Sequence, residues 1–156
     1  MMLTQFLVSF IATSAFAVLF YAPRRCCLFC GMVGSLAWIS YRAVSMISGS
    51  EALGCFVAAL MLALLARFAS ILLETPTIVF LIPGILPLVP GAGIYYTAFH
   101  LFYGEGEKAF SQGLETLAVS GAISLGMLLA FFFPQALFDH FYQFKRKVKG
   151  EGTGTY

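Results

Sequence analysis

Charged side chains are scarce in this sequence. They account for 10% of its 156 residues, and the formal net charge is only +2. Soluble domains carry roughly 25% charged residues, so this chain has too little polar surface for a water-soluble fold. The small net charge also argues against nucleic acid as a partner, since proteins that bind it gather Lys and Arg on one face. With 60% hydrophobic residues and a mean hydropathy of +0.91, the composition predicts a chain embedded in the lipid bilayer.

Residue types that bind metals or carry out catalysis are few as well. Cys27 and Cys30 have the spacing of a metal or redox motif, but no second Cys pair or nearby His completes four ligands. Apolar packing, or palmitoylation at the membrane edge, is the interpretation we favour for these cysteines and for Cys26. The sequence has no P-loop and therefore no ATPase motif. We expect no metal, no cofactor and no catalytic residue; an intramembrane enzyme is the less favoured alternative.

The sequence is dominated by apolar runs long enough to cross a membrane, which takes about 20 residues per helix. Cutting the chain at charges, prolines and glycine-rich joints gives runs at about residues 3–20, 26–48, 52–73, 77–103 and 108–133. The first run lacks the charged start of a signal peptide, so we expect it to remain as a helix. The fold class predicted is an all-α, polytopic membrane helix bundle of about five transmembrane helices over residues 1–144. A basic and then disordered tail is expected over 145–156.

The orientation of the bundle follows from where Lys and Arg lie. Arg24 and Arg25 occupy the first joint, and residues 145–149 carry most of the lysines. Basic residues in short loops mark the cytoplasmic side, so an even number of crossings must separate these two segments. Five spans satisfy this, with the N-terminus outside and the C-terminus in the cytoplasm. A four-span alternative, in which the fourth run is re-entrant, places the two basic segments on opposite sides.

The fourth run is interrupted by prolines and glycines. Each proline inside a helix removes a backbone donor and costs about 3 kcal/mol or more. Irregular backbone at membrane depth persists only where it is buried in protein or lines a wet cavity. Free carbonyls there can hold a cation, and the amides near residues 91–95 can hold an anionic group. The alternative is a kinked helix with no ligand. The interrupting residues are Pro76, Pro83, Gly84, Pro87, Pro90, Gly91 and Gly93.

Residues 79–91, Val-Phe-Leu-Ile-Pro-Gly-Ile-Leu-Pro-Leu-Val-Pro-Gly, closely resemble the signature of the threonine/serine exporter family, in its small-subunit (YjjB-like) half. Residues 16–25, which end in Pro-Arg-Arg, and the group Trp38, Tyr41 and Arg42 resemble its first two helices. The resemblance covers roughly residues 10–135. It implies an inner-membrane protein that works with a larger subunit of the same family to export threonine, serine or dicarboxylates such as succinate. It assigns no role to individual residues.

Three ionisable side chains fall within the predicted spans, where each costs about 2.5–3.5 kcal/mol at mid-helix. Arg42 and Arg67 are expected to flank the broken run from opposite sides, and Glu115 to pair with Arg42. A carboxylated substrate favours arginine, which binds planar carboxylates with two hydrogen bonds. Tyr95 and Tyr96 follow the break and offer hydroxyl groups. The alternatives are arginines that extend to the interface and tyrosines that belong to an aromatic belt.

These residues define the substrate pathway that the sequence predicts. The function predicted is that of a small subunit of a secondary-type exporter of small carboxylated metabolites, acting with the larger subunit. Transporters usually contain two matching bundles, and this chain has no evident internal repeat, so we expect association with that partner or as a homo-oligomer. The alternative is a structural or regulatory subunit whose partner holds the pathway. The predicted pathway residues are Pro83, Gly84, Pro87, Pro90, Gly91, Gly93, Tyr95, Tyr96, Arg42, Arg67 and Glu115.

Overall fold

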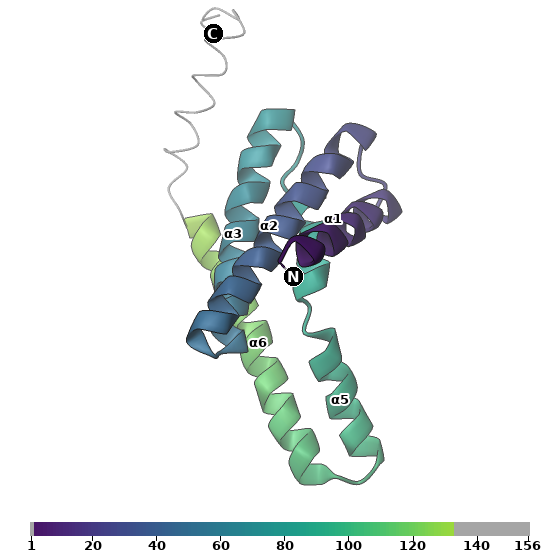
Figure 1. The fold of residues 1–156 in the computed structure, drawn as a ribbon, viewed down its shortest axis with the longest axis vertical. Helices are drawn as coiled ribbons and strands as arrows, with labels where there is room; N and C mark the ends of the chain where they lie inside the picture. Colours follow the sequence, from purple (N-terminus) through teal and green to yellow (C-terminus); the bar gives the residue numbers. More distant parts are fainter. Residues whose placement is uncertain (1, 133–156) are drawn as a thin grey trace, which may run out of the picture.

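A computed structural model describes residues 2–132 of the protein, and over this range the chain is a succession of helices (Figure 1). The predicted all-α fold is confirmed. The tail predicted for 145–156 and the end of the bundle at 133–144 lie outside the described residues. The helices are α1 (Met2–Leu19), α2 (Arg24–Ser48), α3 (Glu51–Leu73), α4 (Ile78–Ile85), the 3-10 helix η1 (Leu86–Leu88), α5 (Gly91–Phe102) and α6 (Gly106–Phe132).

Four helices, α1, α2, α3 and α6, are each long and apolar enough to cross a membrane. The segments Ile78–Leu88 and Gly91–Phe102 pass the same test together, but a bend of 46° separates them. The described residues therefore contain four spans, or five if the bent pair counts as one. This agrees with the prediction of about five helices with a broken fourth, and a re-entrant fourth segment remains the alternative.

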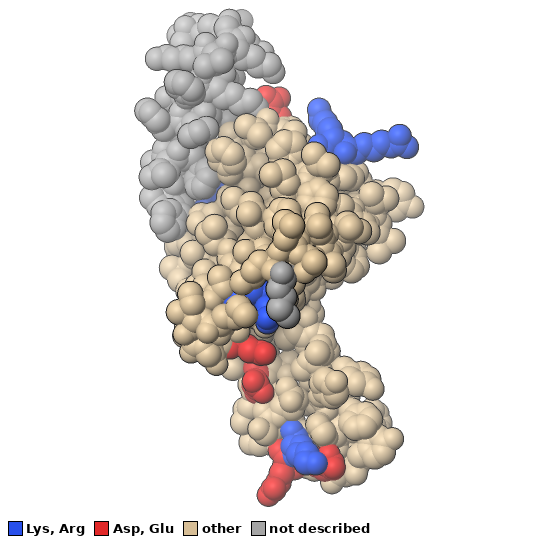
Figure 2. All heavy atoms as spheres, viewed as in Figure 1, with Lys and Arg blue, Asp and Glu red and all other residues tan. Residues whose placement is uncertain are grey.

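The helices form a bundle from which a hairpin extends. α2 packs between α1 and α3, α4 contacts all three, and α3 also packs along α6. α5 packs chiefly against α6, and these two helices form the hairpin that extends beyond the ends of α1 and α2 in Figure 1. On the face shown in Figure 2, charged side chains interrupt a largely uncharged surface only in small groups. Such a surface suits a lipid environment.

Small residues allow the helices of the bundle to approach closely. The sequence contains Ala59 with Ala63, and Ala118 with Ala122 and Gly126, at four-residue spacing, which predicts close contact in a bilayer. This prediction is confirmed for Gly126. A Cβ atom placed there would meet the backbone carbonyl oxygen of Phe56 and lie 3.2 Å from the Cβ of Ala59. The backbones of α3 and α6 are therefore in contact at this point.

The joint between α2 and α3 places an acidic residue at the start of α3. Gly49 ends α2 in the left-handed conformation, with φ of 67°, which glycine adopts without strain. Ser50 then caps α3 by accepting a hydrogen bond from the Leu53 amide at 3.5 Å. Glu51 follows in the first turn, where a negative charge interacts favourably with the helix dipole.

The cysteines of α2 belong to the packing of the bundle. Cys26 and Cys30 are fully buried, and the Sγ atom of Cys30 donates to the carbonyl oxygen of Val79 in α4 at 3.4 Å. The sulfur of Cys26 lies 3.7 Å from the hydroxyl of Thr75. These contacts join α2 to the segment that leads into the break.

Candidate functional site

The break in the fourth run is an unwinding of the chain over a few residues. α4 continues through Pro83, tightens into η1, and is followed by Val89 and Pro90 in non-helical conformations. A regular helix resumes at Gly91, where the Ile94 amide donates to the carbonyl of Pro90 at 3.2 Å. The first amides of a helix have no partner within it, so those of Ala92 and Gly93 are available to other acceptors.

A cavity of about 490 Å³ lies beside this break, and we name it the break cavity. Its walls come from α2, α3, the segment from η1 into α5, and α6. A polar site is thus assembled from parts of the chain that are far apart in sequence. The lining residues are Trp38, Tyr41, Glu51, Cys55, Pro87, Leu88, Val89, Pro90, Gly91, Ala92, Gly93, Tyr96, Gln112, Glu115, Thr116 and Val119.

Part of the predicted pathway lines this cavity, namely Pro87, Pro90, Gly91, Gly93, Tyr96 and Glu115. Pro83 and Gly84 do not. They are buried in the bundle, where a Cβ on Gly84 would meet the side chain of Leu62. Tyr95 is 61% exposed and its ring stands edge-on to that of Tyr96. The break thus has a structural half in α4 and a half that faces the cavity.

Neither arginine of the predicted pathway is among the lining residues. Nη1 of Arg67 donates to the carbonyl of Ala130 at 2.9 Å, and its guanidinium lies 5.9 Å from the ring centre of Phe131. Arg67 therefore joins α3 to the C-terminal end of α6. Arg42 follows Tyr41 in α2, and its Nε atom is buried without a hydrogen-bond partner. Within residues 2–132, no ion pair connects Arg42 to Glu115.

Two glutamates supply the charge of the break cavity. Glu51 comes from the first turn of α3 and Glu115 from α6, and both also line an adjoining cavity of about 440 Å³ at the α2–α3 joint. The N-terminus of α5 forms another part of the wall and carries the partial positive charge of a helix start. One site thus presents an acidic region and a region that favours anions.

Uncharged polar groups lie near the two glutamates. Gln112 and Thr116 come from the same face of α6 as Glu115, and the Thr116 hydroxyl donates to the carbonyl of Gln112 at 2.7 Å. The lone pairs of that hydroxyl remain able to accept a hydrogen bond. The cavity therefore offers carboxylates, a hydroxyl, a side-chain amide and backbone amides to a small polar molecule.

Several lining residues were not among the predicted pathway residues. Gln112, Glu115 and Thr116 follow a spacing of three and four residues, which places them on one face of a helix. A polar stripe on an otherwise apolar run is a signal that identifies Gln112 and Thr116 from sequence. No comparable signal identifies Glu51, because its position after Ser48-Gly49-Ser50 predicts a loop. The sequence also does not show which face of α2 Trp38 occupies.

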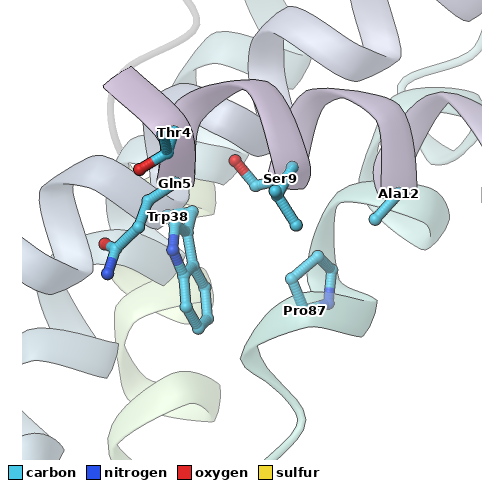
Figure 3. A pocket seen from close by; sticks show the side chains of 7 residues that line it. Thr4, Gln5, Ser9, Ala12, Trp38 and Pro87 are labelled. Atoms are coloured by element: carbon cyan, nitrogen blue, oxygen red, sulfur yellow. The ribbon is translucent and has the colours of Figure 1, made fainter. Parts of the chain in front are cut away.

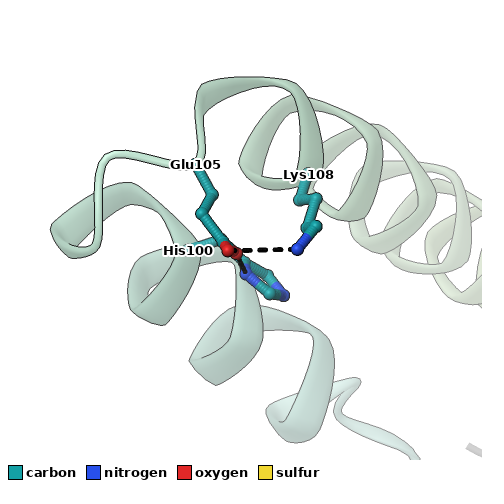
Figure 4. Close-up of polar contacts among 3 residues, drawn as sticks. All are labelled: His100, Glu105 and Lys108. Atoms are coloured by element: carbon teal, nitrogen blue, oxygen red, sulfur yellow. Dashed lines mark hydrogen bonds and ion pairs between the residues drawn. The ribbon is translucent and has the colours of Figure 1, made fainter.

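The tip of the α5–α6 hairpin carries a small charged cluster (Figure 4). Nζ of Lys108 donates to Oε1 of Glu105 at 3.0 Å, and Nδ1 of His100 lies 2.6 Å from Oε2 of the same carboxylate. Hydrogen bonds from Lys108 and His100 hold the pKa of the Glu105 carboxyl below its usual value. The cluster therefore closes the turn between the two helices.

A bundle of apolar helices with a bent helix pair beside a cavity is the structure of a multi-pass membrane protein, and broken helices of this kind are typical of transporters. The family model described as Threonine/Serine exporter, ThrE, matches residues 5–133, and the chain belongs to this family. The resemblance seen in the sequence is thereby confirmed. No curated protein and no solved structure matches the chain.

Proposed function

We propose that the chain is the small subunit of a secondary-type exporter of small amino acids such as threonine and serine, and that the substrate passes through the break cavity. The observation that carries this proposal is the distribution of charge in that cavity. An amino acid at neutral pH carries an ammonium and a carboxylate group. Glu115 and Glu51 suit the ammonium, and the amides at the start of α5 suit the carboxylate.

The same charges bear on the choice among the substrates that the family resemblance implies. A dicarboxylate such as succinate would bring two negative charges into a cavity that already holds Glu51 and Glu115, and no Lys or Arg among residues 2–132 lines that cavity. Like charges at short range in a partly desolvated site repel strongly. We therefore expect threonine and serine to be preferred over succinate.

A larger partner subunit would complete the pathway. α5 contains no buried residue, although it is rich in large apolar side chains, and it forms one wall of the cavity. Because α5 packs chiefly against α6, its remaining apolar surface is available for contact with another chain. The N-terminus outside, the C-terminus in the cytoplasm and a location in the inner membrane belong to the same proposal.

The test is efflux of labelled threonine, serine and succinate from cells that contain the larger subunit and a variant of this chain. Glu115→Gln should reduce threonine efflux by about tenfold or more, because a hydrogen bond to a charged group is worth about 1.5–3 kcal/mol. Glu107→Gln is the matched control, since Glu107 lies on α6 outside the cavity lining. Unchanged threonine efflux with Glu115→Gln at a normal membrane level would instead favour a partner that holds the whole pathway.

A further inference from the structure

The break borders a second cavity, which α1 covers. It has a volume of about 390 Å³, and we name it the α1 cavity. Trp38 and Pro87 line both this cavity and the break cavity. Figure 3 shows these two side chains facing those of α1 across the space. The α1 cavity is lined by Thr4, Gln5, Val8, Ser9, Ala12, Trp38 and Pro87.

The lining of this cavity is mostly apolar, as expected for a helix with a mean hydropathy of 1.9, but three polar side chains of α1 interrupt it. Thr4, Gln5 and Ser9 contribute to the lining. Oε1 of Gln5 is buried without a hydrogen-bond partner, and Ser9 is only 6% exposed. A buried amide oxygen with no partner is costly in an apolar medium. The Gln5 oxygen therefore favours a water molecule or the polar group of a small solute at this point of the wall.

We propose that the α1 cavity is a second compartment of the substrate pathway, and that Trp38 forms with Pro87 the gate between the two compartments. This inference rests on the proposed function and adds a gating residue to it. Both volumes fall within the range of about 300–1,000 Å³ that is usual for small-molecule sites. The solute that leaves Glu115 would pass Trp38 to reach Gln5 and Ser9.

The two gate residues differ in their freedom to move. Pro87 lies in η1, and its ring has no side-chain torsion that would let it swing aside. The ring of Trp38 lies beside that of Tyr41, at 5.2 Å between centres and 45° between planes. A change of rotamer at Trp38 moves a large planar group and requires no change of backbone. Trp38 is therefore the mobile side of the gate and Pro87 the fixed side.

Accessibility of an engineered cysteine tests the gate. Ser9→Cys places a thiol in the α1 cavity, and the native Cys55 reports on the break cavity. A charged, membrane-impermeant thiol reagent is added to right-side-out and to inside-out vesicles that contain the protein with its partner subunit. Labelling is measured peptide by peptide by mass spectrometry, so that the other cysteines do not interfere. A charged reagent cannot reach position 9 through lipid.

Trp38→Ala should raise the labelling rate at position 9 by about tenfold or more, which corresponds to a barrier lowered by about 1.4 kcal/mol. Trp38→Phe retains an aromatic ring and should give a rate near that of the parent. Phe110→Ala removes an exposed aromatic ring that lines neither cavity and is the control for general loosening. The gate is rejected if position 9 reacts equally with and without Trp38, or if it reacts in neither protein while Cys55 does.

The proposed function is separated from the gate by a protection experiment. Labelling at position 9 in Trp38→Ala requires no substrate, so it reports on the connection between the cavities alone. Saturating threonine should slow labelling at both Cys55 and position 9. If the labelling rate at position 9 depends on Trp38 but is not slowed by threonine, serine or succinate, the gate is supported and the proposed substrate class is rejected.

Discussion

The contact between α3 and α6 at Gly126 should be intolerant of a single added methyl group. A Cβ at Gly126 would meet the carbonyl oxygen of Phe56 and lie 3.2 Å from the Leu60 amide nitrogen, and backbone atoms of a helix cannot rotate away. Gly121, on the same helix, offers a matched control, because a Cβ there meets nothing within 4 Å. Both substitutions to Ala gain the same helix propensity, so their difference isolates the steric effect.

The expected size of that difference follows from overpacking, which costs about 1–3 kcal/mol. For a chain of this length about 1 kcal/mol corresponds to about 2–4 °C in Tm, so Gly126→Ala should melt about 2–12 °C below Gly121→Ala. Unfolding in detergent can be followed by maleimide labelling of Cys26 and Cys30, measured peptide by peptide, since both are fully buried in the folded protein. Equal Tm values for the two variants would refute the close contact of α3 with α6.

Two further predictions concern the cavity and the hairpin tip. Gly91→Ala places a methyl group in open space at the cavity wall, so it should reduce threonine export while keeping the Tm within about 2 °C, whereas Gly93→Ala meets the Thr116 side chain and should lower both. Equal effects on Tm would contradict this. Glu105→Gln should lower the Tm slightly. The pKa of Glu105 is lower in the folded state than its ordinary value of 4.5. The stability that the ionised carboxylate contributes is therefore fully present above pH 4.5 and is lost as the pH falls through the lowered pKa. Melting curves across pH check this, and a pH-independent difference would contradict it.

The sequence predicted the break because prolines act locally. Pro83, Pro87 and Pro90 disrupt helical hydrogen bonds whatever surrounds them, and the structure bends by 46° between Leu88 and Gly91. The helix bounds were predictable for the same reason. The second run was expected at 26–48, and α2 extends over Arg24–Ser48.

The lining of the cavity was only partly predictable. The position of a residue within a predicted span gives its depth in the membrane, but it does not show which side of the helix faces the cavity. The sequence predicted the depth of Arg67 but not its hydrogen-bond acceptor, the backbone carbonyl of Ala130. Every residue has a backbone carbonyl, so this acceptor leaves no signal in the sequence. Glu51 and Glu115 come from different helices and share a cavity only after α3 docks on α6. Helices that are apolar on most faces give little indication of which face turns inward.

The lack of any buried residue in α5 determines what controls the width of the break cavity. The opposite walls belong to α2 and α3, which are held by fully buried residues such as Ala37 and Leu62. The α5 wall packs mainly against α6, and large apolar side chains such as Leu101 and Phe102 are exposed on this helix. We therefore expect the width of the break cavity to respond to whatever packs against α5 in the membrane, without any change to the interior of the bundle.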